Sequence, residues 1–240
     1  MTGDEVTRPM EATGARDVVL EIENLQHAYH RTVALRGVGL AVAAGEIVAV
    51  TGPSGCGKST LLHAAAGLLR PSAGTVRLFG RDVSGLDDDA RARLRRTDLA
   101  LVLQFGQLVN ELTGTDNVAL PLLLDGHDPR EARELARDWL ERCGAAEVAD
   151  AVPPDMSGGQ AQRVAVARAL VTSPRLVLAD EPTGSLDQLG GRALLDLLVG
   201  EAVARGTALV IVTHDNAVAA RAHREVRLLD GVVTSEAVLT

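Results

Sequence analysis

The chain has 240 residues, 46% of them hydrophobic, and a formal net charge of -8 at pH 7. This length fits one large domain or two small ones, and the apolar fraction is enough for a sizeable core. The acidic balance argues against a nucleic-acid-binding surface, and the two cysteines, Cys56 and Cys143, are too few for a disulfide framework.

Residues 1–17 are polar and carry charges of both signs, so we expect a flexible leader. They lack the apolar core of a signal peptide. No uninterrupted apolar run approaches the ~18 residues that a membrane-spanning helix needs. We therefore expect a protein that is not secreted and that reaches a membrane only through a partner.

Strand-like stretches follow at 18–25 and 38–42, with Tyr29 between them. A turn at 43–45 then leads into a buried strand at 46–50, which is continuously apolar after its first residue.

The next nine residues fit the P-loop pattern G-x-x-x-x-G-K-[ST] in the expected context, after a strand and before a helix. They are Gly52, Pro53, Ser54, Gly55, Cys56, Gly57, Lys58, Ser59 and Thr60. Glycines let the backbone N–H groups turn inward, and the helix N-terminus adds positive potential, so the loop suits phosphate groups. We expect Lys58 to reach the β- and γ-phosphates and the Ser59 hydroxyl to hold Mg²⁺.

Lys58 is the only lysine in a chain whose other basic residues are all arginine. A compact ammonium suits a narrow phosphate pocket better than a planar guanidinium does. The alternative is a glycine-rich turn that arose by chance, and the flanking strand and helix disfavour it.

Beyond the P-loop we expect a strand at 75–80 and a helix at 87–96, whose acids come first and whose arginines come last, as the helix dipole favours. Those arginines form either a solvated helix face, which we favour, or a nucleic-acid contact. A strand at 98–103 ends at Gln104, and the pattern is mostly helical between 107 and 166.

Strand character returns at 175–180 and 208–213, and residues 225–234 predict a hairpin around Asp230-Gly231. Apolar strands that alternate with helices predict a mostly parallel sheet covered on both faces. Ligands of such sheets bind at the carboxyl ends of the strands.

Polar groups that follow these strands should therefore meet at one edge of the sheet: the P-loop, Gln104, Asp180 with Glu181, and His214. Asp180 can hold Mg²⁺ opposite Ser59, and Glu181 can polarise an attacking water. Gln104 can bind the metal and that water, and His214 can contact the γ-phosphate. The alternatives are a helix cap or turn pair at 180–181, a turn glutamine and an ordinary strand-end histidine.

A second glycine-rich segment, Ser157-Gly158-Gly159-Gln160, lies about a hundred residues after the P-loop and precedes a helical stretch. It is either a second anion-binding helix N-terminus or an ordinary helix capped by Ser157.

Taken together, these motifs resemble those of the ATP-binding cassette (ABC) ATPases, the nucleotide-binding subunits of transporters, over about residues 18–233. In that resemblance Gly52–Ser59 is similar to the Walker A loop, Gln104 to the Q-loop glutamine, Ser157–Gln160 to the signature, Asp180–Glu181 to the Walker B pair, Asp187 to the D-loop aspartate, His214 to the switch histidine, and Tyr29 to the aromatic residue that stacks on adenine. Met156 stands where the signature usually has leucine; both are flexible apolar residues, so we expect activity to survive.

The resemblance implies an α/β P-loop NTPase fold with a mixed, mostly parallel sheet core, an N-terminal antiparallel β subdomain and an inserted α-helical subdomain at about 107–165. A short tail would follow at 234–240. ATP and Mg²⁺ are the implied cofactors. The implied catalytic residues are Glu181, His214, Gln104 and Lys58, and the implied metal ligands are Ser59, Gln104 and Asp180.

The resemblance also implies a head-to-tail dimer, in which the signature of one copy closes over ATP held by the P-loop of the other. The further partner would be an integral membrane permease, which would hold the chain at the cytoplasmic face of the cell membrane; no nucleic acid is implied. An apolar run at 118–124, just beyond Gln104, is expected to be mainly core, with permease contact as the alternative.

The stretches Glu181–Asp187 and Asn117–Leu122 resemble the lipoprotein-release, macrolide-export and cell-division branch of the family. An ATPase that transmits force across a membrane without transport remains an alternative, and an importer subunit is a weaker one. A soluble cassette that acts on DNA or ribosomes is disfavoured by the acidic charge and by the lack of a long coiled coil or a second cassette.

Overall fold

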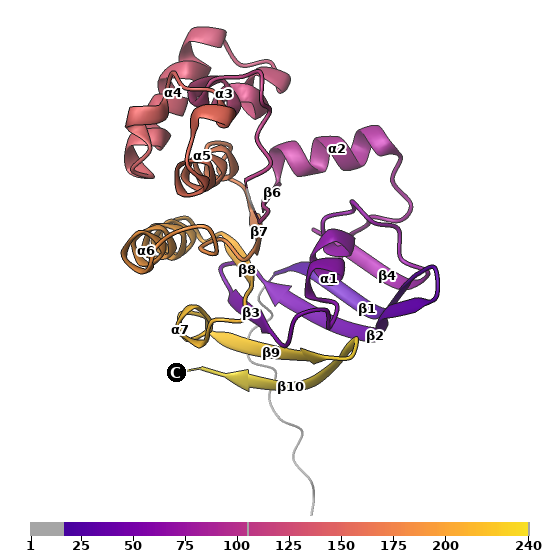
Figure 1. Cartoon of the computed structure of the whole chain (residues 1–240). Coiled ribbons are helices and arrows are strands. Elements are labelled where there is room, and N and C mark those ends of the chain that lie inside the picture. The colour runs from indigo at the N-terminus through magenta and orange to yellow at the C-terminus, as the bar shows by residue number, and fades with distance from the viewer. Residues whose placement is uncertain (1–16, 105, 240) are drawn as a thin grey trace, which may run out of the picture.

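The computed structural model describes residues 17–104 and 106–239 (Figure 1). The expected flexible leader lies outside the described residues, except for Asp17. The strands are β1 (Val18–Tyr29), β2 (Thr32–Ala43), β3 (Ile47–Thr51), β4 (Ala73–Leu78), β5 (Arg81–Asp82), β6 (Leu99–Val102), β7 (Leu176–Asp180), β8 (Ala208–Val212), β9 (Arg224–Leu229) and β10 (Val232–Val238). The helices are α1 (Lys58–Ala65), α2 (Asp88–Thr97), α3 (Gly114–Leu124), α4 (Pro129–Arg142), α5 (Gly158–Leu170), α6 (Gln188–Arg205), α7 (Asn216–Ala219) and the short 3-10 turns η1 (Ala146–Val148) and η2 (Pro153–Asp155).

A six-stranded sheet forms the centre of the molecule, with the strand order β10-β9-β3-β8-β7-β6. All neighbouring strands in it are parallel except β9 and β10, which pair antiparallel. The predicted mixed, mostly parallel sheet is therefore confirmed.

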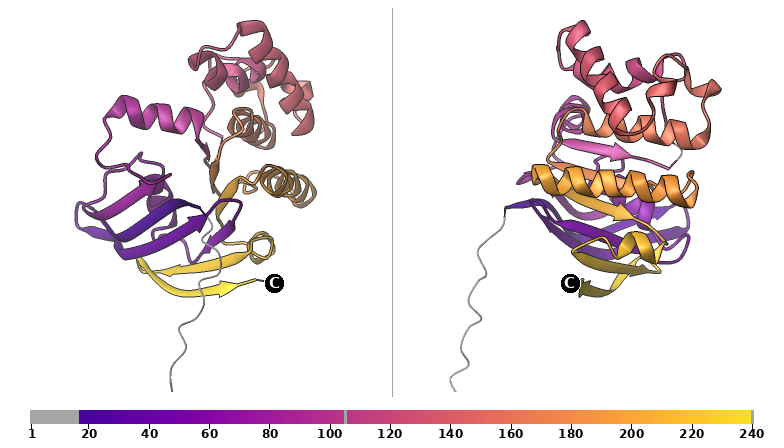
Figure 2. Two further views of the ribbon diagram at one scale, coloured as in Figure 1. Left: turned by 180° about the vertical axis from the view of Figure 1, so that it is seen from behind. Right: turned by 90° about the vertical axis from the view of Figure 1, so that its left-hand side faces the viewer.

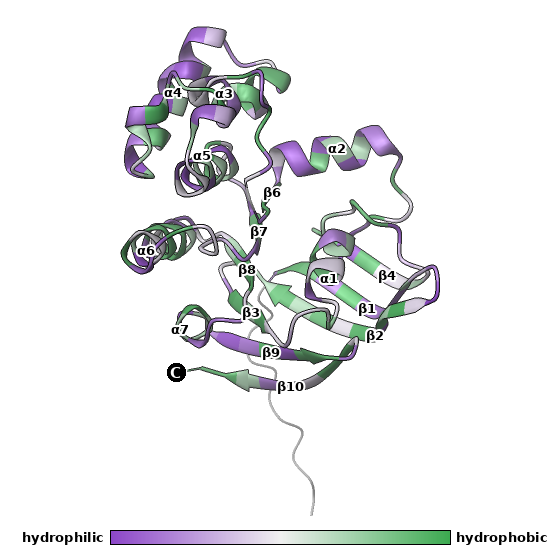
Figure 3. Ribbon diagram, in the orientation of Figure 1, coloured by the Kyte–Doolittle hydropathy of each residue, from purple (hydrophilic) through white to green (hydrophobic). Residues whose placement is uncertain are grey.

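Both faces of this sheet are buried, as its continuously apolar strands predict. In β3, Ile47 and Ala49 join one hydrophobic cluster, which also contains side chains of α5 and α6. Val48 and Val50 point the other way, into a cluster with α1, β1 and β2. Figure 2 shows α6 lying along one face of the sheet, and Figure 3 shows apolar residues concentrated in the central strands.

The second sheet is antiparallel, with the order β2-β1-β4-β5, and it confirms the predicted N-terminal β subdomain. Its first two strands are longer than the sequence indicates, since β1 and β2 form one hairpin that turns at residues 30–31. The prediction stopped at residue 25 because residues 26–30 are mostly polar. Backbone pairing nevertheless continues there through several register shifts between β1 and β2.

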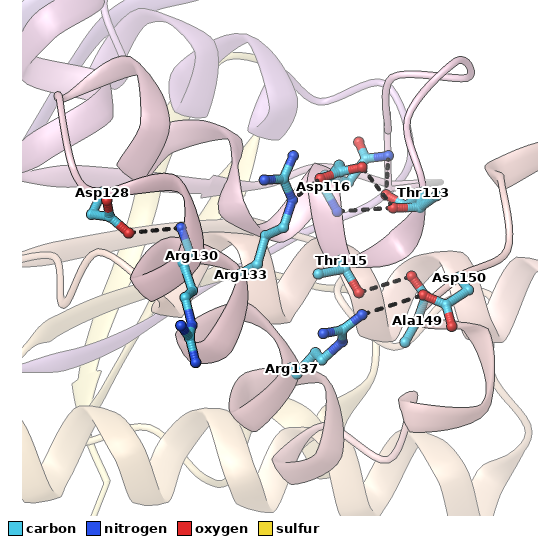
Figure 4. A network of polar contacts seen from close by, with 10 residues as sticks. Thr113, Thr115, Asp116, Asp128, Arg130, Arg133, Arg137, Ala149 and Asp150 are labelled. Atoms are coloured by element: carbon cyan, nitrogen blue, oxygen red, sulfur yellow. Dashed lines mark hydrogen bonds and ion pairs between the residues drawn. The ribbon is translucent and has the colours of Figure 1, made fainter.

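The helical subdomain consists of α3, α4 and the two 3-10 turns, packed on α5 at the top of Figure 1. Polar contacts join its parts (Figure 4): Thr115 Oγ1 donates to the carbonyl of Ala149 at 2.9 Å, and Arg133 Nε donates to Asp116 Oδ1 at 2.8 Å. The subdomain also contacts α6 through Trp139 of α4. The guanidinium carbon of Arg205, in α6, lies 5.2 Å from the centroid of the Trp139 ring, and that of Arg142, in α4, lies 4.1 Å from it.

The apolar run at 118–124 divides between core and surface. Val118, Ala119 and Leu122 are buried in the cluster shared with α5 and α6, whereas Leu124 is 63% exposed. The expectation of mainly core thus describes one side of α3, and the other side is available to a partner.

Two further elements, β10 and α6, differ from what the sequence indicates. The predicted hairpin is present, but β10 continues to Val238, into the segment expected to be a short tail. No helix was delimited between 181 and 207, yet α6 spans 18 residues. Gly190, Gly191 and Gly200 lower its intrinsic helix propensity, and burial against the sheet outweighs that cost.

Candidate active site

Four strand ends lie side by side at one edge of the central sheet. Val50 of β3 and Asp180 of β7 both pair with Val212 of β8, and Val102 of β6 pairs with Ala179 of β7. Since these strands are parallel, the segments that follow them leave the sheet at the same edge. The P-loop, Gln104, the 180–181 pair and His214 all begin there, as the alternation of strands and helices predicted.

Two P-loop glycines, Gly52 and Gly57, lie where other backbone segments leave no room for a side chain. Gly52 has φ +144°, and a Cβ at this position would collide with the carbonyl oxygen of Leu228 in β9. Gly57 has φ +106°, and a Cβ there would collide with the carbonyl oxygen of Ala34 in β2. The loop is therefore clamped between two strands that are distant in sequence. Gly55, in contrast, has φ +78° and no atom within 4 Å of the position of a Cβ.

Lys58 begins α1 and is only 8% exposed. Its Nζ donates to the carbonyl oxygens of Gly52 at 2.8 Å and Pro53 at 3.0 Å, so the ammonium lies across the loop. Among the described residues this buried cation donates to neutral carbonyls alone, so it is well placed to exchange them for phosphate oxygens. Ser59, in the first turn of α1, is exposed.

Glu181 occupies a strained backbone position beside Asp180. Its φ is +45°, in the left-handed region that non-glycine residues rarely adopt, and its N–H donates to the carbonyl of Val212 at 2.9 Å. Such strain tends to be kept where a side chain must be aimed precisely for function.

The carboxylate of Glu181 contacts both residues that follow β8. Its Oε1 lies 2.6 Å from His214 Nδ1, and its Oε2 accepts a hydrogen bond from Thr213 Oγ1 at 3.5 Å. The hydrogen bond with Glu181 and the charge of its carboxylate raise the pKa of His214. The sequence did not predict Thr213 as a residue of the site. The signal that could have found it is its hydroxyl side chain, which stands between an apolar strand and the candidate histidine.

Gln104 is exposed just beyond β6, and its Nε2 lies 4.0 Å from where a Cβ of Gly184 would be, so it is near the loop that follows Glu181. The backbone around Gln104 is held by α5. Arg168 donates to the carbonyls of Gly106 at 2.9 Å and Gln107 at 3.1 Å. This positioning role of Arg168 was not predicted, because its carbonyl partners lie about 60 residues away in the sequence.

Tyr29 ends β1 at the hairpin turn and is 46% exposed. Its ring makes an edge-to-face contact with His27, with 4.6 Å between the ring centroids. The same hairpin meets the P-loop through Ala34, whose carbonyl faces Gly57. An exposed aromatic ring on an element that touches the phosphate loop can stack on a base.

Ser157 and Gln160 form a reciprocal capping box at the start of α5. Ser157 N–H donates to Gln160 Oε1 at 2.8 Å, and Gln160 N–H donates to Ser157 Oγ at 3.2 Å. Among the described residues no hydrogen bond joins this segment to the P-loop. The segment meets the loop after β7 through Ser185 Oγ, which donates to the carbonyl of Gly158 at 3.3 Å. Within the described part of one copy, the two glycine-rich segments are therefore not joined by hydrogen bonds.

Asp187 acts as a helix cap in this structure: its Oδ1 accepts from the Gly190 N–H at 2.6 Å at the start of α6. By its resemblance to the D-loop aspartate, Asp187 was expected to lie among the nucleotide-binding residues. The cap accounts for one of its carboxylate oxygens.

The residues expected to hold Mg²⁺ offer oxygen donors, which that ion prefers. Asp180 is 6% exposed, and no described residue donates a hydrogen bond to its side chain. A nearly buried carboxylate without such a donor fits a metal partner. Over the described part of the chain no three His, Cys, Asp or Glu side chains form a metal-binding group. A Mg²⁺ ion would therefore depend on Ser59, Gln104 and the substrate as well as on Asp180.

Comparison with known proteins gives a consistent result. The family model described as ABC transporter matches residues 35–184. A lipoprotein-releasing system ATP-binding protein, LolD, of Shewanella sp. (strain MR-7) is 42% identical over 226 residues, which cover 92% of this chain and 98% of LolD. The corresponding protein of Gluconobacter oxydans (strain 621H) is 47% identical over 197 residues, covering 82% of this chain and 85% of its own.

Among solved structures, the chain is similar to a dimeric post-hydrolysis state of the ATP-binding cassette MJ0796 bound to ADP and Pi. The TM-score is 0.89 at 36% sequence identity, over 92% of this chain and 99% of that one. A further dimeric structure of MJ0796, described as a bacterial ABC transporter cassette, matches with the same TM-score and identity.

Proposed function

Since this chain belongs to the ABC transporter family, we propose that it is the ATP-hydrolysing subunit of a lipoprotein-release type of transporter and that it works as a two-fold homodimer. The observation that carries the proposal is the geometry at one sheet edge, where a clamped P-loop lies beside a strained glutamate that is hydrogen-bonded to a histidine.

Binding of ATP would begin at the P-loop and the β1–β2 hairpin. Lys58 would exchange the carbonyls of Gly52 and Pro53 for oxygens of the β- and γ-phosphates, while backbone N–H groups of the loop and the N-terminus of α1 hold the remaining charge. Tyr29 would stack on the adenine ring.

Mg²⁺ would be held by Ser59, Gln104 and Asp180. When bound, it neutralises charge on the phosphate oxygens.

Hydrolysis would use Glu181 as the general base for the attacking water. Its carboxylate is aimed by the hydrogen bonds with His214 and Thr213. A general base of this kind contributes ~10²–10⁴-fold to the rate. His214, which is 72% exposed at its side chain, would turn to the γ-phosphate once ATP is present and stabilise the charge there.

The second half of each site would come from the partner copy. Ser157 and Gly158 are exposed at the N-terminus of α5, and among the described residues no hydrogen bond joins them to the P-loop of their own chain. One P-loop leaves part of the triphosphate open to water, and a second helix N-terminus from a two-fold partner can cover it. The dimeric structures of MJ0796 support this assembly.

The membrane partner would be a permease with a large extracytoplasmic domain, which would hold the dimer at the cytoplasmic face of the membrane. Across the residues that the structure describes, no helix is long and apolar enough to cross a bilayer. The LolD relatives, at 42–47% identity, support the lipoprotein-release branch.

The test is the Glu181→Gln variant. It should retain ATP binding, lose at least ~100-fold in hydrolysis rate, and accumulate as a dimer with saturating ATP and Mg²⁺, measured by light scattering after size exclusion. Glu134→Gln, an exposed carboxylate on α4, is the matched control and should behave like the wild type. A Glu181→Gln protein that stays monomeric would contradict the proposed dimer cycle.

A further inference from the structure

A small pocket lies at the amino ends of β7 and β8, whereas the proposed ATP-site residues follow the carboxyl ends of these strands. Its volume is about 230 Å³. Its walls are the turn at 173–175 before β7, the turn at 205–207 before β8, and Asp17, Val19 and Ala44 at the open end of the β1–β2 hairpin. Pockets for drug-sized ligands begin at about 300 Å³, so this one suits a smaller molecule.

Charged groups of both signs line this pocket without pairing with one another. Arg175 and Arg205 contribute guanidinium groups, and Asp17 contributes a carboxylate. In the described part of the chain no ion pair joins Asp17 to either arginine, and Arg175 has no ion pair with any residue. The carboxyl end of α6 also lies at the pocket, and its dipole adds partial negative charge. Opposite charges that share so small a pocket and do not meet leave room between them for a ligand that carries both signs.

Both arginines are held in place by aromatic rings, although the chain has only four aromatic residues. The guanidinium carbon of Arg175 lies 4.2 Å from the centroid of the Phe79 ring, and that of Arg205 lies 5.2 Å from the centroid of the Trp139 ring. A guanidinium stacked on a ring keeps the N–H groups at its edge available to an anion. Glu201 fixes Arg205 further, since its Oε2 accepts from the Nε of Arg205 at 3.0 Å. Groups held in advance lose little conformational entropy when a ligand binds.

The backbone is strained at two residues that build this pocket. Ser173 has φ +53° and Phe79 has φ +52°, in the left-handed region that non-glycine residues rarely adopt. The N–H of Phe79 donates to the carbonyl of Val19 at 2.9 Å, and the hydroxyl of Ser173 accepts from Arg205 at 2.6 Å. The hydrogen of that hydroxyl therefore remains available to a ligand. Such strain tends to be kept where a side chain must be aimed for function.

We propose that this pocket binds a small zwitterion, with a phosphate monoester between Arg175 and Arg205 and an ammonium group beside Asp17. A phosphate monoester carries up to about two negative charges, which two guanidinium groups match, and it accepts paired hydrogen bonds from each of them. The ammonium group gives the carboxylate a partner of opposite charge. Aminoalkyl phosphates such as phosphoethanolamine have this chemistry, either as free compounds or as lipid headgroups. The inference goes beyond the proposed function and does not depend on it.

The first experiment titrates the full chain separately with phosphoethanolamine, inorganic phosphate and ethanolamine. A non-hydrolysable ATP analogue with Mg²⁺ is present throughout, so that the P-loop is not free to bind phosphate. NMR shifts of the backbone amides of Arg175 and Thr207 report binding at the pocket. Phosphoethanolamine should bind roughly tenfold more tightly than inorganic phosphate, because a charge-assisted contact to Asp17 is added. Ethanolamine alone should bind more weakly than either.

Two variants test the two ends of the pocket. Arg175→Gln should weaken binding of phosphoethanolamine and of inorganic phosphate about tenfold or more, because a charged donor is lost. Asp17→Asn should remove the preference for phosphoethanolamine and tighten inorganic phosphate about twofold or more, because a repelling charge is lost. A gain in affinity does not arise from misfolding. Arg192→Gln is the matched control, since Arg192 is exposed on α6 and does not line the pocket. It should bind both compounds as the wild type does.

The outcomes decide the inference without bearing on the ATP site. If phosphoethanolamine causes no saturable shift of the two amides, or if Arg175→Gln binds it as tightly as the wild type does, the pocket is not a phosphate site and the inference is wrong. If inorganic phosphate binds the wild type as tightly as phosphoethanolamine does, the zwitterion is wrong. Vesicles of phosphatidylethanolamine that displace the soluble compound would identify a lipid headgroup as the ligand, and vesicles that do not would identify a free compound; either supports the pocket. The proposed function stands in every case.

Discussion

The P-loop and the segment at the start of α5 are both glycine-rich helix N-termini, but they are held in different ways. The P-loop is clamped by β2 and β9, whose carbonyls leave no room for a side chain at Gly57 or Gly52. The segment at the start of α5 is held mainly by its own helix, through the hydrogen bonds between Ser157 and Gln160.

This difference fits the two roles proposed for them. The P-loop has to bind a triphosphate by itself, so its geometry is prepared before the ligand arrives, and Lys58 is kept buried with replaceable carbonyl partners. In the proposed dimer the other segment would act only when a second copy brings its ATP, and local capping is enough to keep such a segment folded while it is exposed. Long-range contacts thus hold the segment proposed to bind ATP first, and local contacts hold the segment proposed to close over the partner's ATP.

The largest effect should come from breaking the clamp on the P-loop. Gly52→Ala forces a Cβ against Leu228 at a φ that suits glycine, so we expect a loss of about 3–5 kcal/mol in unfolding free energy and loss of nucleotide binding. Urea unfolding measures the change in unfolding free energy, and titration with a fluorescent ATP analogue measures nucleotide binding. Gly55→Ala, where no atom lies within 4 Å of the added Cβ, should cost only about 1–2 kcal/mol. Equal losses in the two variants would show that the clamp has no special importance.

A smaller effect on stability is expected from changes in the segment at the start of α5. Ser157→Ala removes the cap of α5 and should cost about 1 kcal/mol of stability. ATP affinity of the monomer should not change, but ATP-driven dimerisation of a Glu181→Gln background should be lost. Ser157→Asp separates the two roles, since it keeps the cap and places a negative charge where the partner's phosphates would lie. It should keep the stability and still fail to dimerise. A loss of monomer ATP affinity in either variant would contradict a role for this segment in trans.

The smallest effect concerns the charge beside the P-loop. Glu181 raises the pKa of His214, so the imidazolium–carboxylate pair is fully present below the ordinary histidine pKa of about 6.5 and is lost as the pH rises through the raised value. Glu181→Gln should therefore lower the pKa of His214 towards 6.5, measured by NMR of the imidazole protons. Asp215→Asn, which removes a weaker charge contribution, should lower it less. An unchanged pKa in Glu181→Gln would mean that the contact does not persist in solution.

Much of the fold was predictable because its signals are local. The strands at 46–50, 175–180 and 208–213 have continuous apolar runs of strand length, and they correspond to β3, β7 and β8. The helix predicted at 87–96 has acidic residues at its start and arginines at its end. It corresponds to α2, which begins after Asp87, whose side chain accepts a hydrogen bond from the N–H of Ala90. The strands that exceeded their predicted limits, β1, β2 and β10, are held by pairing that a single stretch of sequence does not reveal. The helix α6, for which no limits were predicted, is held by burial against the sheet.

The sequence by itself determined the chemistry of the site. The P-loop spacing, the carboxylate pair after an apolar strand and the histidine after the next strand each follow from residue type and local order. The tertiary structure alone decided how these groups are aimed: Glu181 onto His214 and Thr213, Lys58 onto its own loop, and Arg168 onto the carbonyls beyond Gln104. It also decided that one side of the 118–124 run is core and the other lines a groove with three arginines. The reason is that such contacts join atoms that lie tens of residues apart, and their geometry depends on how strands and helices pack.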